Sequence, residues 1–354
     1  MESLSGTRAQ EYTVLALNCG SSSLKFGIYF SDGETARAFC EGEAEEIGSD
    51  TDYSAALARA LESLNQKGAP EFDAIGHRFV HGGSHFREHQ QVTPEVLFRL
   101  RAVVDYAPLH MPTALAVLET MQKNAPAKPQ VVCFDTAFHR TMPDVSKTYA
   151  LPGSVRELGV ERYGFHGLSL ESIVAQLHPL PDRLVVAHLG NGASVTAIRN
   201  GRSIDTTMGL TPTGGVMMGT RCGDLDPGLM VYLMRHGYAN PDVLETLFDR
   251  HSGLLGVSGI TSDVRQLLNK RTTDKQADLA LKMFCYQVRK AIASMAGALS
   301  GVDAVVFTGG IGEHADELRK EISTGLEFLG DIRIMTLPSQ EDLQIAKITA
   351  KLIA

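Results

Sequence analysis

An arginine surrounded by glycines makes residues 203–227 the densest candidate site in the sequence. The stretch SIDTTMGLTPTGGVMMGTRCGDLDP holds five glycines, three aspartates and one arginine, Arg221. A long loop of this kind is usually functional. A fixed guanidinium in a glycine-lined pocket suits a carboxylate or a phosphoryl group. The alternative is a structural arginine paired with Asp224 or Asp226.

Two other glycine-rich segments follow apolar, strand-like runs. In Val14–Tyr29 the tip Cys-Gly-Ser-Ser-Ser offers backbone N–H groups and hydroxyls to an anion; an ordinary solvated hairpin turn is the alternative. Gly309–Glu313 follows a strand and precedes a helix, and a helix N-terminus behind a glycine loop favours phosphates. Only about 40 residues remain after it, too few for a full dinucleotide-binding domain.

Four histidines recur at a spacing of four residues: His77, His81, His85 and His89. On a helix this spacing would form a metal-binding stripe. The residues between them read as a strand followed by Gly-Gly, which would break a helix, so we do not expect a metal site here. Arg78 is the more interesting residue, because it ends an apolar run. A surface arginine on an edge strand is the alternative.

The hydrophobic pattern predicts alternating strands and helices in both halves of the chain. Strands are expected in the hairpin 14–29 and at 74–80, 130–134, 183–188, 195–199, 203–206 and 304–308, with Asn200-Gly201 as a hairpin turn. Helices are expected at 53–65, 94–106, from Pro112 onward, and at 227–236, 241–250, 277–300 and 340–353, the last capped by Ser339. Each half opens with a hairpin, which indicates two related α/β domains facing one another.

Composition excludes several classes of protein. With 354 residues, 44% hydrophobic and 21% charged, the chain is typical of a two-domain globular protein. A net charge of −8 disfavours nucleic acid and anionic membranes as partners. The five cysteines lack a C-x-x-C pair, and no signal peptide or run of 18 apolar residues is present, so we expect a cytoplasmic protein. The Walker A, G-x-S-x-G and H-E-x-x-H motifs are missing from the sequence.

Taken together, the motifs resemble the acetate/propionate kinase family. The resemblance rests on segments 17–26, 76–83, 107–110, 134–139, 163–167, 188–194, 205–227 and 307–313. It implies the α/β fold shared with sugar kinases, Hsp70 and actin: two ribonuclease H-like domains facing a nucleotide cleft. The implied domains are residues 1–138 with 343–354, and residues 139–342, which would bind nucleotide and form a homodimer.

The implied reaction is reversible, Mg²⁺-dependent transfer of the ATP γ-phosphoryl group to acetate, giving acetyl phosphate and ADP. Mn²⁺ is an alternative metal and propionate an alternative substrate, since one methylene in an apolar pocket changes binding by only about 1–3 kcal/mol. A carboxylate nucleophile carries no proton, so the reaction needs no general base. A non-catalytic nucleotide-binding module of the same fold is the more remote alternative.

The resemblance also assigns roles by position. The implied catalytic residues are Arg78, Asp135, His166, Arg221 and His110. The implied substrate pocket consists of Arg78, Val80, Leu109, Phe165 and Pro212. The implied nucleotide contacts are Ser21, Ser23, Lys25, His188, Asn191, Gly192, Asp263, Val264, Arg265, Gly309, Gly310, Ile311 and Gly312. Asn18 and Glu341 would hold the metal ion.

The chain departs from the family pattern at several places. Cys19 replaces the usual alanine of the first loop, Met111 and His314 each replace an asparagine, and Val264 stands where many relatives carry an aromatic residue against adenine. The segment between residues 330 and 337 is also shorter than usual. That segment leads to Glu341, so its length bears directly on the metal site.

Overall fold

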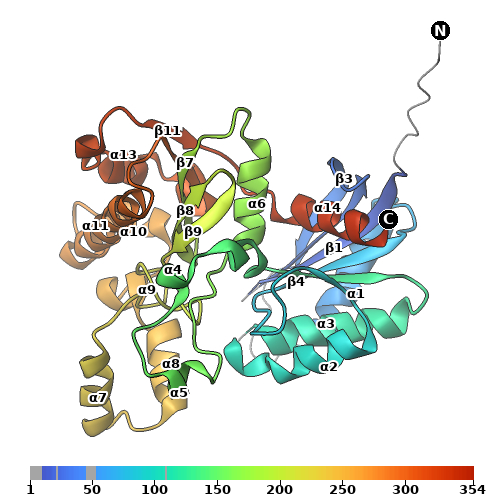
Figure 1. Ribbon diagram of the computed structural model, residues 1–354, viewed down its shortest axis with the longest axis horizontal. Helices are drawn as coiled ribbons and strands as arrows, with labels where there is room; N and C mark the ends of the chain where they lie inside the picture. The colour runs from blue at the N-terminus through green and yellow to red at the C-terminus, as the bar shows by residue number, and fades with distance from the viewer. Residues whose placement is uncertain (1–9, 21–22, 45–52, 108–109) are drawn as a thin grey trace. The chain divides into compact units, whose positions relative to one another are not determined.

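The computed structural model describes residues 10–20, 23–44, 53–107 and 110–354, which divide into two compact units. Unit 1 comprises Met1–Ala137, Gly167–Ser172 and Gln340–Ala354, and unit 2 comprises Phe138–His166 and Ile173–Ser339. Both units contain a mixed sheet with helices, as expected for an α/β protein (Figure 1). The domain boundaries expected at residues 138 and 342 stay a prediction.

Unit 1 is built on a six-stranded sheet of order β3-β2-β1-β4-β6-β5. Its strands are β1 (Tyr12–Cys19), β2 (Leu24–Ser31), β3 (Ala36–Ala44), β4 (Ala74–Phe79), β5 (Gln90–Gln91) and β6 (Gln130–Phe134). The predicted β1–β2 hairpin is confirmed. Strands β1, β4 and β6 are parallel neighbours, so their carboxyl ends lie at one edge of the sheet.

The helices of unit 1 cover both faces of this sheet. They are α1 (Tyr53–Gln66), α2 (Pro94–Ala102), α3 (Met111–Asn124) and α14 (Glu341–Ile353), and α6 (Gly167–Gln176) begins in this unit. Thr93 caps α2 as expected, but α2 ends at Ala102 and a separate 3₁₀ turn follows it. The expected Ser339 cap of α14 is wrong: Gln340 is the N-cap residue, and its side chain makes no capping bond.

The last helix packs against the first strands of the chain (Figure 1). Val14 and Ala16 of β1 form a buried cluster with Ile345 and other residues of α14. Side chains alternate along a strand, so these residues face α14 while Leu15 and Leu17 face the opposite side. Hydrophobic burial therefore brings the end of the chain onto the sheet where the chain begins.

Unit 2 has a five-stranded sheet of order β11-β10-β7-β8-β9. Its strands are β7 (Arg183–Leu189), β8 (Ala193–Arg199), β9 (Arg202–Thr206), β10 (Ala304–Thr308) and β11 (Arg333–Thr336). Strands β7, β8 and β9 form a meander, and β10 pairs parallel with β7 and β11. The predicted turn is confirmed, since Asn200 and Gly201 both have positive φ angles.

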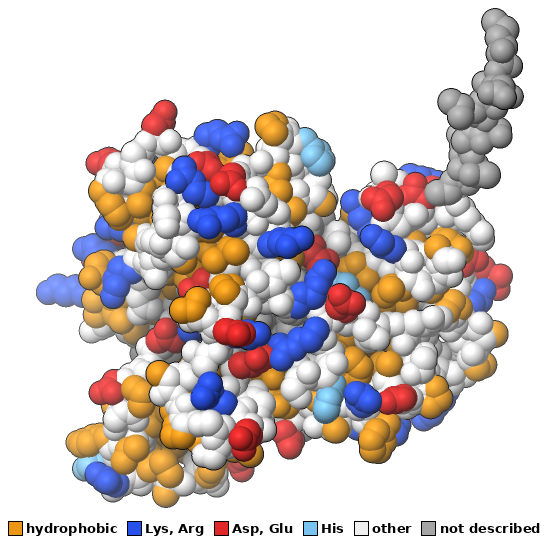
Figure 2. All heavy atoms as spheres, in the orientation of Figure 1, with side chains coloured by type: hydrophobic (Ala, Val, Ile, Leu, Met, Phe, Trp, Pro, Cys, Tyr) orange, Lys and Arg blue, Asp and Glu red, His pale blue; other side chains and the backbone are white. Residues whose placement is uncertain are grey.

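Helices α4 (Asp144–Lys147), α5 (Gly153–Arg156), α7 (Pro227–Arg235), α8 (Pro241–Arg250), α9 (Gly253–Ser258), α10 (Val264–Lys270), α11 (Lys275–Ala298), α12 (Gly309–His314) and α13 (Asp316–Thr324) complete unit 2. Asp274 caps α11, which packs on the sheet. The glycine loop expected at 309–313 is instead the first turn of α12, with Thr308 as N-cap. No described helix has the length and apolarity needed to span a membrane. Charged side chains of both signs are interspersed over the face in view (Figure 2).

The packing of α14 generates a stability prediction. A Cβ atom added to Gly76 of β4 would overlap the Thr349 hydroxyl and lie 2.5 Å from Ile345 Cγ2. We expect Gly76→Ala to lower the free energy of unfolding by about 1–3 kcal/mol, measured in urea, because the core is overpacked. Gly297→Ala in α11 is the control: a Cβ there meets open space, so stability should rise by up to about 1 kcal/mol. A Gly76→Ala protein as stable as the wild type would contradict this packing.

Candidate functional site

Arg78 lies at the centre of a polar cluster at the carboxyl edge of the unit 1 sheet. Asn18 is near the end of β1, Arg78 near the end of β4, and Asp135 directly follows β6. Arg78 donates to Asp135 from Nε (3.0 Å to Oδ1) and from Nη2 (2.6 Å to Oδ2), and from Nη1 to Asn18 Oδ1 (2.9 Å). Strand β4 lies between β1 and β6, so the alternative of a surface arginine on an edge strand is wrong.

The start of α14 supplies two carboxylates to the same cluster. Asn18 Nδ2 donates to Glu341 Oε2 (3.2 Å) and to Asp342 Oδ1 (2.6 Å), and Arg78 Nη1 lies 3.7 Å from Glu341 Oε2. Asn18 and Glu341, which the resemblance assigns to one metal ion, are thus direct neighbours, and their role in binding the metal stays a prediction. Asp342 was not among the predicted residues, although two adjacent acids in the first turn of a helix are a readable signal.

The charges in this cluster are strongly coupled. Burial opposes the charge on Arg78, but Asp135 and Glu341 outweigh it and raise the pKa of the guanidinium above its ordinary value. Burial raises the pKa of Asp135, while Arg78 opposes the rise. Burial also raises the pKa of Asp342 to about 6, against the hydrogen bond from Asn18 and with a further contribution from Glu341. A cation beside Glu341 and Asp342 would offset the repulsion between these two carboxylates.

The donor atoms around Asn18 fit a magnesium ion. Carboxylate and amide oxygens are the ligands that Mg²⁺ prefers, and it usually binds through one or two carboxylates while keeping several waters. Across the part of the chain that the structure describes, no three His, Cys, Asp or Glu residues are grouped as metal ligands. The adjacent carboxylates of Glu341 and Asp342 therefore match Mg²⁺ better than a metal such as zinc, which takes a closed ligand set. The Asn18 amide turns its NH₂ group toward them and would contact the ion through water.

Three of the four spaced histidines have separate structural partners, and the fourth, His85, is exposed. His77 shares a hydrogen bond of 2.8 Å with Gln130, and burial lowers the pKa of His77 to about 4 against that bond. His81 Nδ1 accepts from the Gly83 N–H (2.7 Å). His89 Nδ1 accepts from the Phe134 N–H (3.0 Å) and its Nε2 lies 3.2 Å from Glu171. His89 thereby supports the end of β6, next to Asp135.

Unit 2 holds a second cluster around His166. This residue is the N-cap of α6 and has a φ angle of 59°, in the left-handed region that a non-glycine residue rarely adopts. Its Nδ1 lies 2.9 Å from the Ser194 hydroxyl, and its ring stacks on His188 with centroids 4.1 Å apart. Both histidines are mostly buried. A strained residue held by several contacts marks a candidate functional site.

Arg221 lies close to this histidine pair. A Cβ atom added to Gly192 would lie 3.2 Å from both Arg221 Nη1 and His166 Nε2, so both side chains reach the Gly192 backbone. Arg221 Nη1 donates to the Pro212 carbonyl (3.3 Å). Asp224 accepts from the Gly215 N–H, and Asp226 caps α7. The structure thus brings Arg221, His166 and Gly192 together, as a site for an anion requires.

Several predicted nucleotide-contact residues of unit 2 lie near the ends of β7 and β10. A Cβ atom added to Gly309 would lie 3.2 Å from His188 Nε2, and the Gly309 N–H donates to Glu313. A Cβ added to Gly219 would overlap Asn191 Oδ1 and lie 3.4 Å from Ser262 Cβ, which places Asn191 near the start of α10. There Asp263 caps the helix and pairs with Arg265 at 2.8 Å, and Val264 is buried. Gly310, Ile311 and Gly312 complete the first turn of α12.

For most of the remaining predicted residues, the structure gives a position but does not test the predicted role. Ser21 and Leu109 lie outside the described residues. Ser23 donates to Glu43 (2.6 Å), Lys25 is exposed opposite Asn18 on β2, and His110 is the N-cap of α3. Val80 is buried in unit 1 and Phe165 in unit 2, so their expected part in one acyl pocket stays a prediction, as does that of Pro212.

Comparison with known proteins gives a consistent result. The model of the Acetokinase family matches residues 13–340. An acetate kinase of Rhodopseudomonas palustris is 40% identical over 94% of this chain and 96% of its own length, and one of Oceanobacillus iheyensis is 37% identical over 96% and 98%. A propionate kinase structure from Francisella tularensis superposes with a TM-score of 0.89 at 33% identity, covering 96% of this chain and all of that one. A Porphyromonas gingivalis acetate kinase gives 0.83 at 32% identity, covering 97% and 100%.

The raised pKa of Asp342 predicts a pH-dependent stability. The folded state holds the Asp342 proton more tightly than the unfolded chain, so stability falls as pH rises from about 4 to about 6. Asp342→Asn removes this loss and should raise the free energy of unfolding by about 1–2 kcal/mol at pH 7.5, with little change at pH 4. Urea unfolding at both pH values measures it, with the exposed Asp331→Asn as control. An equal effect of Asp342→Asn at both values would contradict the pKa.

Proposed function

The chain belongs to the acetokinase family of phosphotransferases, and we propose that it transfers the γ-phosphoryl group of ATP reversibly to acetate, giving acetyl phosphate and ADP. The observation that supports this most directly is the convergence of Asn18, Arg78, Asp135 and Glu341 on one cluster. These residues come from the first strand, the centre of the sheet and the last helix. They are the residues that the resemblance assigns to the metal ion and the reacting anions.

The protein must mainly offset the negative charge of the reacting carboxylate and phosphate groups. Phosphoryl transfer to a carboxylate requires positioning and electrostatic stabilisation rather than a base. Asp135 is buried and bonded to Arg78 through both oxygens, so its role is to orient that guanidinium. Nη1 and Nη2 of Arg78 each carry two N–H groups, and the bonds to Asn18 and Asp135 leave donors on both nitrogens for the acetate carboxylate or the phosphoryl oxygens.

The metal ion would be held at the start of α14. Glu341 and Asp342, with Asn18 beside them, would hold Mg²⁺ directly or through water. When bound, Mg²⁺ offsets the negative charge of the phosphate groups. Asp342 must be ionised to contribute, which its raised pKa of about 6 allows at neutral pH.

The unit 2 cluster would act on the phosphoryl group and the nucleotide. Arg221 and His166 offer donors to the transferring oxygens, since both side chains reach the Gly192 backbone. The first turn of α12 would offer its helix N-terminus to the ATP phosphates. His188 and Asn191 lie beside closely approaching glycine backbone there. Asp263–Arg265 would contact the rest of the nucleotide.

Formation of acyl phosphate tests the proposal. The purified protein with Mg²⁺, ATP and acetate should give a hydroxamate on trapping with hydroxylamine, and acetate should be favoured over propionate in kcat/KM. Arg221→Ala should lower kcat at least about 10²-fold, because a donor to the transition state is lost. Arg99→Ala, which removes only an exposed ion pair with Glu95, should leave kcat unchanged. No hydroxamate from the wild-type protein would refute the function, and near-normal turnover of Arg221→Ala would refute the role of that residue.

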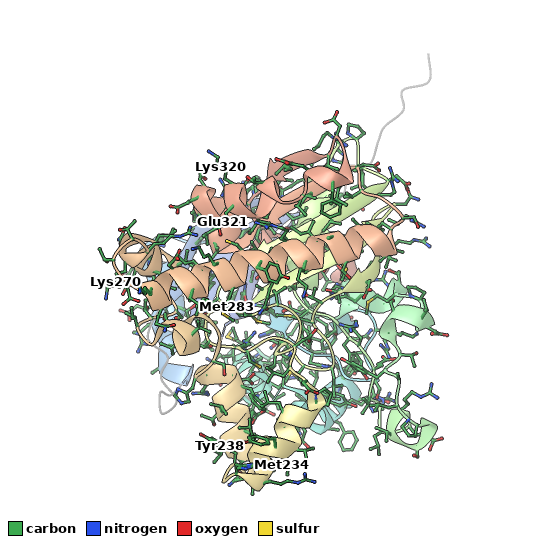
Figure 3. The ribbon with its side chains drawn as sticks, turned by 90° about the vertical axis from the view of Figure 1, so that its left-hand side faces the viewer. Met234, Tyr238, Lys270, Met283, Lys320 and Glu321 are labelled. Carbon is green, nitrogen blue, oxygen red and sulfur yellow. The ribbon has the colours of Figure 1, made fainter. Side chains whose placement is uncertain are left out.

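The same proposal includes a homodimer and a cytoplasmic location. No residue of helix α7 is buried, although the helix is apolar, and it exposes Leu229, Met230, Val231, Tyr232 and Met234. Met234 and Tyr238 mark this end of unit 2 in Figure 3. A contiguous exposed apolar surface of this kind is typical of a protein interface, and a second copy of the chain is the partner that the family suggests. All five cysteines are free thiols, which supports a reducing compartment.

Light scattering after gel filtration measures the assembly. The wild-type protein should have twice the chain mass of 38.3 kDa. Met230→Lys should shift the protein toward the monomer, because it places a charge within the exposed α7 surface. Phe98→Lys on α2 is the control, since it changes an even more exposed apolar side chain elsewhere and should leave the mass unchanged. A monomeric wild-type protein would contradict the dimer.

A further inference from the structure

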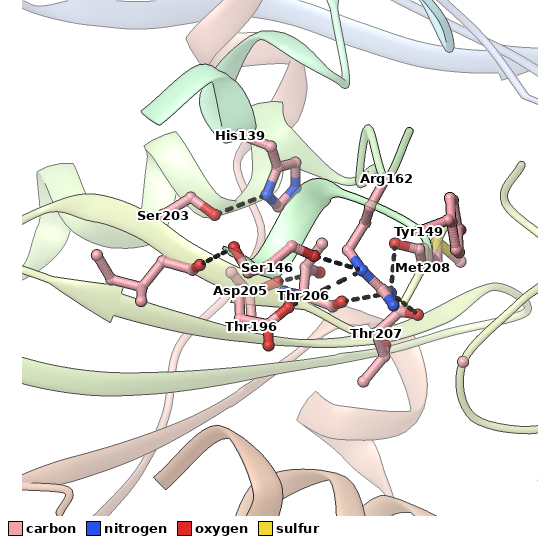
Figure 4. A network of polar contacts seen from close by, with 12 residues as sticks. His139, Ser146, Tyr149, Arg162, Thr196, Ser203, Asp205, Thr206, Thr207 and Met208 are labelled. Atoms are coloured by element: carbon pink, nitrogen blue, oxygen red, sulfur yellow. Dashed lines mark hydrogen bonds and ion pairs between the residues drawn. The ribbon is translucent and has the colours of Figure 1, made fainter. Parts of the chain in front are cut away.

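A network of polar contacts in unit 2 lies outside the residues assigned to the reaction (Figure 4). It joins two stretches that are far apart in sequence. One is residues 146–165, which lead directly to His166. The other is residues 204–210, which lead from β9 to Pro212 and the loop that carries Arg221.

Arg162 provides most of the contacts between these stretches. Its Nη1 donates to the carbonyl oxygens of Thr206 (2.9 Å), Thr207 (2.9 Å) and Met208 (3.3 Å). Its Nε donates to the Ser146 carbonyl (3.2 Å) and lies 4.0 Å from Asp205 Oδ1. One guanidinium thus holds three successive carbonyls of the segment that leaves β9 (Figure 4). The planar, always charged fork of arginine suits this task better than lysine does.

A second set of contacts continues the same connection. Tyr149 Oη accepts from the Leu210 N–H (3.0 Å), and the Arg162 guanidinium lies 5.7 Å from the centre of the Tyr149 ring. The Tyr163 N–H donates to the Gly209 carbonyl (3.0 Å). A Cβ on Gly209 would overlap Tyr149 Oη, so the two stretches approach closely there.

Each end of the connection lies next to a residue that the proposed function assigns to phosphoryl transfer. The Pro212 carbonyl accepts from Arg221 Nη1, two residues beyond the point that Tyr149 holds. On the other stretch, His139 lies 2.9 Å from the Phe165 carbonyl, which immediately precedes the strained His166. A carbonyl oxygen accepts only, so His139 Nε2 carries the proton in this bond. Hydrogen bonds to backbone carbonyl oxygens, of Pro212 and of Phe165, are therefore found at both ends of this connection.

We infer that Arg162, with Tyr149, is a positioning residue that sets the place of Arg221 relative to His166. Arg162 bonds only to protein groups in the contacts described, so it acts through the two residues that reach Gly192. The inference rests on the proposed function, since it assigns Arg221 and His166 to the same phosphoryl transfer. A displacement of about 1 Å at such a site costs about 10²-fold in rate, even when the mutation lies away from the chemistry.

Matched arginine variants test this role. Arg162→Gln should lower kcat by about 10- to 100-fold, while KM for ATP stays within about threefold of wild type. Arg162→Lys should recover part of kcat, because an ammonium group can still bond some of the carbonyls. Arg183→Gln is the control: Arg183 also ties backbone elements of unit 2, through Asp303 and the Ser300 carbonyl. It should lower the melting temperature similarly and leave kcat unchanged.

Tyr149→Phe keeps the test decisive should Arg162→Gln fail to fold. It removes only the hydroxyl that holds the Leu210 N–H and should lower kcat by about three- to tenfold. Wild-type kcat in folded Arg162→Gln, or in both Arg162→Lys and Tyr149→Phe, would overturn the positioning role. An equal loss of kcat in Arg183→Gln would also overturn it, by showing a general effect of lost stability. A wild-type protein that forms no acyl phosphate would instead overturn the proposed function.

Discussion

The buried pairing of Arg78 with Asp135 is the interaction on which the unit 1 site depends. A guanidinium that is mostly out of water is stable only when its charge and its N–H groups are matched, and Asp135 does both through two oxygens. The pairing also constrains its surroundings. Asn18 accepts from the same guanidinium and donates to the two carboxylates of α14, so the arginine, the amide and the helix start form one continuous network.

This network explains why the last helix matters as much as the first strand. Packing of α14 on β1 and β4 buries apolar side chains, and the same packing delivers Glu341 and Asp342 to Asn18. Burial of Asp342, with a smaller contribution from repulsion by Glu341, raises the pKa of this carboxyl. Hydrophobic burial thus supplies the free energy that holds two carboxylates together at the proposed Mg²⁺ site. Burial also raises the pKa of the nearby Cys19 thiol to about 12, with Arg78 opposing, which disfavours the reactive thiolate form.

Unit 2 achieves its positioning by different means. There the key residue, His166, has a backbone conformation that costs free energy, and hydrogen bonds to Ser194 and stacking on His188 hold it. Arg162 connects the neighbouring stretch to the segment before Pro212 through backbone carbonyls. Bonds to carbonyls depend little on which side chains those residues carry. Such a role is therefore difficult to find in a motif and becomes visible only in three dimensions.

The sequence by itself determined the fold class and the main strands and helices of both units, whereas the roles of the site residues stay predictions. Periodicity placed β6, β10 and α8 at their observed bounds, because strand and helix patterns are local. It failed where tertiary contacts decide a boundary: Gln340 rather than Ser339 is the N-cap of α14, and Gly309 is already helical. It also left Arg78 undecided between a surface edge and a site, because only strand order reveals that β4 is internal. The contact of Asp342 with Asn18, more than 300 residues away, and those of Arg162 with the carbonyls of residues 206–208, more than 40 residues away, needed the tertiary structure for the same reason.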